Sequence, residues 1–169
     1  MAYLKTNDKY AKFNSQIAQN ETNDCFVRSL ATAAEVDYGT AHQVAKETFK
    51  REDKKGTMDA MISAAFLKAE AAGMQVGKNL IAVTVLGKTH LKNRYKLKGE
   101  IIWRKKTLKS FIESHLKGTY IVTVAGHALT VKDGELLDWD KMAYKPTRKV
   151  QAAYQIAVQK NEPVQLSLF

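Results

Sequence analysis

Apolar residues recur at helical spacing in the first half of the chain. In the stretch that follows Cys25, the residues Val27, Leu30, Ala31 and Ala34 are apolar and stand at positions i, i+3, i+4 and i+7. This spacing predicts a helix with one buried face that begins near Cys25. Thr22 and Asp24 precede the stretch, and both residue types are suitable N-caps.

The same spacing predicts three more helices. The second follows Gly39 and Thr40 and has the periodic positions Ala41, Val44, Ala45 and Thr48. The third, with Thr57 as its cap and Gly73 after its end, has Met58, Met61, Ile62, Ala65 and Ala69. The fourth begins after Thr107 and ends before Gly118, with Leu108, Phe111 and Ile112 on its apolar face.

Strand-forming segments lie between and after these helices along the chain. They are residues 80–86, 100–103, 120–124, 128–131, 135–139 and 150–158. Asp133-Gly134 lies between two of them and is a hairpin signal. Helices followed by antiparallel strands predict an α+β fold, and we expect residues 1–160 to form a single domain with a short tail at 161–169.

Composition and charge narrow the class of protein. The chain has 169 residues, one cysteine and a net charge of +10, with basic runs at 50–55, 90–99 and 104–106. A single cysteine cannot form an internal disulfide, and neither a signal peptide nor an apolar stretch of spanning length is evident, so a cytoplasmic location is expected, with no membrane partner. The positive charge favours contact with DNA or acidic proteins, although a solubilising surface has the same composition.

The position of Cys25 favours chemistry over simple packing. It stands in the first turn of the predicted helix, where unpaired N–H groups and the helix dipole favour a thiolate. A structural cysteine would more naturally occupy a mid-helix position such as Ala31 or Ala34. The chain has four histidines, and His127, which follows Gly126 between two strand segments, has no evident capping or surface role.

The hairpin register brings acids to His127. If Asp133-Gly134 is a two-residue turn, residue 132 pairs with 135 and residue 127 falls opposite 140. Because side chains alternate between faces, Asp138 and Asp140 then share the face of His127, within direct or diagonal reach. Either carboxylate could orient the imidazole as a general base for a thiol.

These residues resemble the papain-like cysteine peptidase superfamily, and most closely its small phage-type and C39-like members. The family pattern N-D-C-x-x-R-x-L-A is matched by NDCFVRSLA, and the pattern of Gly-His, strand, Asp-Gly turn and acid is matched by GHALTVKDGELLD. The resemblance covers the order of elements over roughly residues 15–158. It implies a papain-like fold in which N-terminal helices pack on an antiparallel sheet.

The resemblance also assigns roles to residues. It implies that Cys25 is the nucleophile, His127 the general base and Asp138, rather than Asp140, the orienting acid. It implies an oxyanion-hole amide before the cysteine, for which Gln19 is the candidate and Asn20 and Asn23 are rivals. The expected activity is that of a cysteine hydrolase on a protein substrate. The same order of residues serves transglutaminases and arylamine acetyltransferases, and an inactive relative acting as a basic binding protein is the alternative.

Other chemistries find no support in the residue pattern. There is no CxxC pair, no HExxH and no histidine cluster with metal spacing, so neither a metal nor another cofactor is expected. A phosphate-cradling Gly-rich loop is also missing from the sequence.

The last five residues, QLSLF, resemble the sliding-clamp binding pentapeptide of bacteria. The resemblance implies that Leu168 and Phe169 enter an apolar pocket of the clamp, next to Leu166, while Gln165 makes polar contacts at its rim. We therefore expect the bacterial clamp as a partner, and a phage or mobile-element protein as the source of the chain. The alternative is a tail that packs on its own domain.

Overall fold

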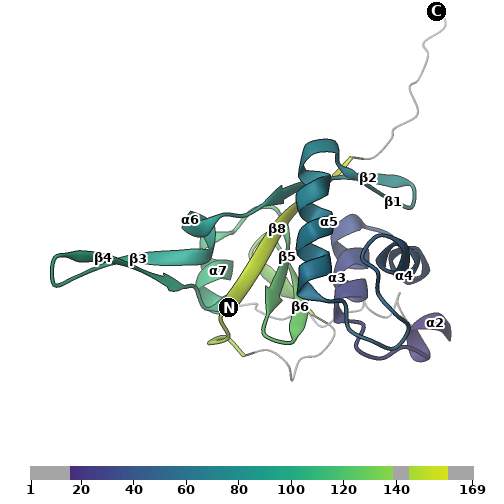
Figure 1. Ribbon diagram of the computed structural model, residues 1–169, viewed down its shortest axis with the longest axis horizontal. Helices are drawn as coiled ribbons and strands as arrows, with labels where there is room; N and C mark the ends of the chain where they lie inside the picture. Colours follow the sequence, from purple (N-terminus) through teal and green to yellow (C-terminus); the bar gives the residue numbers. More distant parts are fainter. Residues whose placement is uncertain (1–15, 139–144, 160–169) are drawn as a thin grey trace, which may run out of the picture.

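A six-stranded antiparallel sheet forms the centre of the protein (Figure 1). The computed structural model describes residues 16–138 and 145–159. In spatial order the strands are β1 (Met74–Val76), β2 (Asn79–Val85), β8 (Val150–Gln159), β5 (Thr119–Val124), β6 (His127–Lys132) and β7 (Glu135–Leu137). A separate two-stranded hairpin, β3 (Lys92–Leu97) with β4 (Glu100–Lys105), projects from the body.

Helices cover both faces of this sheet. One apolar cluster joins it to α3 (Cys25–Ala34), α4 (Tyr38–Glu47) and α5 (Asp59–Ala72). A second cluster contains α7 (Leu108–Ser114), with Leu91 of the short α6 (Lys88–Leu91) packed against it. The remaining helix, α2 (Gln16–Gln19), precedes the loop that leads to Cys25.

Strand alternation divides the apolar residues between the two clusters. On β5, Ile121 belongs to the cluster with α3 to α5, whereas Tyr120 and Val122 belong to the cluster with α7. Successive side chains of the strand therefore face opposite helix layers, because side chains alternate between the two faces of a sheet. The predicted stripe of the first helix is confirmed, since Val27, Leu30, Ala31 and Ala34 are all buried.

The predicted register of the β6–β7 hairpin is also confirmed. Lys132 pairs with Glu135, and Thr130 pairs with Leu137. Asp133 and Gly134 have φ values of 49° and 76°, which is the left-handed pair that a tight hairpin turn requires. One further step along this register places Asp138 diagonal to His127.

Several helix starts differ from the predictions. The predicted cap Thr57 is wrong, because α5 begins at Asp59 with Met58 at the N-cap and no side-chain cap bond. The helix predicted after Gly39 and Thr40 begins earlier, at Tyr38, because the Asp37 side chain caps it by accepting from the Thr40 N–H at 2.8 Å. The Thr107 cap and the Gly73 terminus are confirmed.

The sheet also differs in its membership. The predicted strand at 100–103 is present, but it pairs in the projecting hairpin and not in the main sheet. β1 and β3 were not predicted. The expected strand 135–139 ends at Leu137. The α+β class with an antiparallel sheet is confirmed, with β1 and β2 following the helices directly.

None of the described helices has both the length and the apolar character needed to cross a bilayer. The longest, α5, has 14 residues and extends about 21 Å, against about 30 Å of hydrocarbon.

Candidate active site

Cys25 is the first residue of α3 and is partly buried. Asp24 occupies the N-cap position, but its side chain makes no cap hydrogen bond. Its Oδ2 instead accepts from the Tyr38 hydroxyl at 2.8 Å and from Arg28 Nε at 3.0 Å. The Asp24 side chain thus does not cap the first-turn N–H groups beside the thiol, and N–H groups at a helix N-terminus stabilise negative charge.

His127 and Asp138 form a close pair at the other side of the site. His127 Nε2 lies 2.6 Å from Asp138 Oδ2, and the two side chains are 12% and 2% exposed. His127 is the first residue of β6, directly after Gly126, which has a φ of 70°. Asp138 directly follows β7. The predicted choice of Asp138 over Asp140 agrees with this contact; Asp140 lies outside the described residues.

The environment of His127 favours its protonated form. Burial lowers the pKa of the imidazole, but the hydrogen bond and charge of Asp138 and of Cys25 raise it more, so that the pKa is about 9. The ring is therefore held as an imidazolium at neutral pH in the presence of these two partners. A buried carboxylate beside a buried imidazole is the arrangement that orients a catalytic base.

The Cys25 side chain lies close to His127 and contributes to the raised pKa of its imidazole. Because Asp138 occupies Nε2, the remaining ring nitrogen that can exchange a proton with the thiol is Nδ1. Three residues from α3, β6 and the end of β7 are thus brought together from distant parts of the chain. This arrangement can move a proton from sulfur to nitrogen and hold the resulting imidazolium in place.

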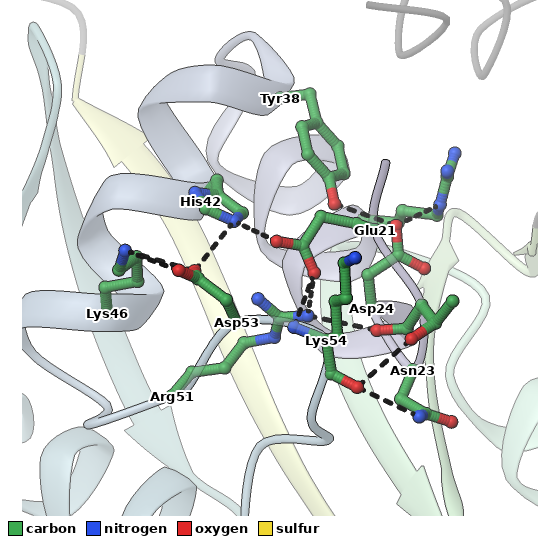
Figure 2. A network of polar contacts seen from close by, with 11 residues as sticks. Glu21, Asn23, Asp24, Tyr38, His42, Lys46, Arg51, Asp53 and Lys54 are labelled. Atoms are coloured by element: carbon green, nitrogen blue, oxygen red, sulfur yellow. Dashed lines mark hydrogen bonds and ion pairs between the residues drawn. The ribbon is translucent and has the colours of Figure 1, made fainter. Parts of the chain in front are cut away.

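A buried ion pair fixes the loop that precedes Cys25 (Figure 2). Glu21 accepts hydrogen bonds from Arg51 Nη2 at 2.7 Å, from the Lys54 N–H at 3.0 Å and contacts His42 Nε2 at 2.8 Å. The Arg51 side chain is 0% exposed and also donates to the Thr22 carbonyl. Burial raises the pKa of Glu21, but the hydrogen bonds from Arg51, His42 and Lys54 together lower it by more, so that the pKa is about 2.

The same loop has two further anchors. The Thr22 hydroxyl and the Asn23 amide both donate to the Lys54 carbonyl, at 3.1 and 3.2 Å. Thr22 is therefore not a helix cap, contrary to prediction, because its hydroxyl bonds to the loop after α4. Burial and the hydrogen bond to Asp24 raise the pKa of Tyr38 well above its usual value, which keeps this hydroxyl a donor. These contacts position Cys25 through its neighbours.

The three predicted oxyanion-hole amides occupy different settings. Gln19 is the exposed last residue of α2, and Asn20 follows it, also exposed. The Asn23 side-chain amide donates one hydrogen bond to the Lys54 carbonyl. Gln19 stays a prediction, with Asn20 and Asn23 as its rivals. The predicted clamp-binding residues at 165–169 lie outside the described residues.

One group of side chains could hold a metal ion. One ligand atom from each of Glu21, His42 and Asp53 lies within 4.8 Å of the others. Arg51 already pairs with Glu21, and Lys46 Nζ lies 3.0 Å from Asp53 Oδ1, so both carboxylates have cationic partners. The network of Figure 2 therefore accounts for these charges without an ion.

Sequence reasoning missed this network. Its members come from three segments, near residues 21, 42 and 51–54, and no local pattern links them. A buried arginine within the basic run 50–55 gives no sequence signal that separates it from the exposed lysines around it.

Comparison with known proteins adds no relative. No protein-family model, curated protein or solved structure matches the chain.

Proposed function

We propose that this protein is a papain-like cysteine hydrolase, of protease or isopeptidase type, that acts through Cys25, His127 and Asp138. The observation that carries the proposal is the position of one imidazole between a helix-opening thiol and the buried carboxylate of Asp138, which accepts a hydrogen bond from the ring. The resemblance of NDCFVRSLA and GHALTVKDGELLD to the superfamily supports the same assignment.

In the starting state of the proposed reaction, the proton of the Cys25 thiol already resides on His127 Nδ1, so that a thiolate faces the imidazolium. The sulfur attacks the carbonyl carbon of an amide, and the carbonyl oxygen takes the negative charge of the tetrahedral intermediate. The N–H of Cys25 and the amide of Gln19 stabilise this oxyanion. The carbon–nitrogen bond then breaks, the leaving amine takes the proton from His127, and a thioester to Cys25 remains.

Water releases the acyl group in a hydrolase. His127 removes a proton from the water as it attacks the thioester, and the thiol leaves with that proton. An amine in place of water would give acyl transfer, as in transglutaminases and arylamine acetyltransferases. Asp138 holds the ring in the productive tautomer through both stages.

The experiment is alkylation of Cys25 by iodoacetamide near pH 6, followed by mass spectrometry. We expect wild type to react faster than a free thiol, because the imidazolium of His127 stabilises charge on the sulfur. His127→Ala should remove this excess, and His90→Ala, which alters an exposed histidine of α6, should keep it. Reaction at the free-thiol rate in wild type, or an unchanged rate in His127→Ala, would contradict the proposal.

A second experiment tests whether Cys25 reacts with a reagent that is recognised as a peptide. A peptidyl vinyl sulfone, which alkylates nucleophilic cysteines after recognition of the peptide, should label wild type and spare Cys25→Ala. Competition by a bacterial lysate then reports a protein substrate. Labelling of both forms alike would place the reaction elsewhere in the chain.

We further propose, on the pentapeptide alone, that QLSLF recruits the protein to the bacterial sliding clamp. The match includes the glutamine, both leucines and the terminal phenylalanine. Recruitment would place the basic body near DNA and a substrate near the replication machinery, as suits a phage or mobile-element protein. A non-catalytic clamp-binding protein is the alternative function, and the alkylation experiment separates the two.

A further inference from the structure

The β3–β4 hairpin and the short α6 before it, residues 88–105, are called the arm below and carry most of the net positive charge of the protein. Residues 88–105 contain seven lysines and arginines against one glutamate, so a formal charge of +6 out of +10 lies in this segment. Figure 1 shows the arm extending away from the sheet and the helices. Its six-residue strands give it a length of about 20 Å.

The charge is concentrated on one face of the arm. In the register, Lys92 pairs with Lys105, Arg94 with Trp103 and Lys96 with Ile101. These six residues share a face, because directly opposed residues do so. Lys88 Nζ lies 4.5 Å from the centre of the Trp103 ring and adds a fifth cation to this face.

The opposite face has a different composition. It pairs Asn93 with Arg104, Tyr95 with Ile102, and Leu97 with Glu100. The guanidinium of Arg104 lies 5.9 Å from the centre of the Tyr95 ring. Lysines on an exposed strand also discourage edge-to-edge aggregation. That role would be served by charges on either face, and it does not explain five cations on one face with no acid among them.

We infer that the arm binds duplex DNA, with its cationic face along the phosphates of the major groove. The major groove is about 12 Å wide and admits a two-stranded β-ribbon. Five cations along about 20 Å are close in number to the roughly six phosphates that one strand of a duplex places along this length, at about 3.4 Å per phosphate. Ile101, which is 51% exposed and lies among the cations on the same face, provides an apolar contact with base edges.

The inference does not rest on the hydrolase. The arm begins after β2 and contains none of Cys25, His127 and Asp138. Cys25→Ala should therefore bind DNA as wild type does, and loss of DNA binding would leave thiol reactivity unchanged.

The experiment is a salt titration of the full chain on a fluorescent duplex of about 30 base pairs, read by anisotropy. If five cations contact phosphates, affinity should fall by about 500-fold between 50 and 200 mM NaCl. The variant K92Q/R94Q/K96Q removes three of the five cations, and its affinity should then fall by only about tenfold over the same range.

The matched control removes three exposed lysines elsewhere, in K68Q/K78Q/K117Q. It should keep the salt dependence of wild type, and circular dichroism should show both variants folded. Equal loss in the two variants would mean that total charge, and not the arm, binds DNA. Equal or tighter binding of single-stranded DNA or of poly-glutamate would assign the arm to another class of partner. No binding of the duplex by wild type at 50 mM NaCl would overturn the inference.

Discussion

Replacing Asp138 with Asn tests the link between the buried carboxylate and the proton on His127. The pKa of His127 is raised from 6.5 to about 9, which corresponds to about 3 kcal/mol in favour of the imidazolium. Asparagine keeps the shape of the side chain and removes its charge. Burial would then oppose the imidazolium with only Cys25 to offset it, so the pKa of His127 should fall toward its ordinary value of 6.5.

The direct assay is an NMR titration of the imidazole in both proteins. Glu100→Gln is the control, because it removes one negative charge from the exposed arm and should leave the pKa of His127 unchanged. A wild-type imidazole that titrates near 6.5, or the same titration in wild type and Asp138→Asn, would refute the reasoning.

The free energy of unfolding gives a second measure. The folded pKa of His127 lies above its unfolded value, so its contribution is fully present below about pH 6.5 and is lost as the pH rises through about 9. Wild type should therefore exceed Asp138→Asn in stability by more at pH 6 than at pH 10. The difference should approach about 3 kcal/mol.

Two further perturbations test other features of the chain. Glu21→Gln leaves the fully buried Arg51 without its counter-ion and should cost about 3–5 kcal/mol in urea unfolding, whereas E21Q/R51M should cost less than the sum of the two single changes; a loss below about 1 kcal/mol for the single change would contradict a supporting role of the pair. Because the pKa of Glu21 is lowered to about 2, its contribution should be lost as the pH falls from about 4.5 toward 2. Removal of residues 165–169 should abolish a roughly micromolar interaction with the purified sliding clamp, measured by titration calorimetry. Equal binding by both forms, or by neither, would end the clamp proposal.

The parts of the site that follow from local rules were predictable. The apolar stripe of α3 sets which residue opens the helix, and Asp133-Gly134 sets the hairpin register, so Cys25, His127 and Asp138 could be named from the sequence. Periodicity and turn chemistry act over a few residues and therefore leave a readable pattern.

The parts that depend on contacts between distant loops were not predictable. Glu21 and Arg51 stand 30 residues apart, and neither has a sequence neighbour that signals burial. β3 was missed because its lysines and asparagine are poor strand formers, and its pairing relies on the turn at Lys98-Gly99, with φ values of 48° and 84°. Gly99, which stands between the segments 92–97 and 100–105, was the turn signal that could have identified the arm.

The position of β8 in the sheet has a consequence for biosynthesis. β8 lies between β2 and β5, and it provides the hydrogen bonds that join β1 and β2 to β5, β6 and β7. A chain emerging from the ribosome at about 5–20 residues per second holds two unjoined half-sheets until residues 150–159 are free. Each half then exposes an unpaired strand edge, which is a template for aggregation. Removal of residues after 159 leaves this closing strand in place, whereas a stop a few residues earlier would leave a nascent chain with both edges open.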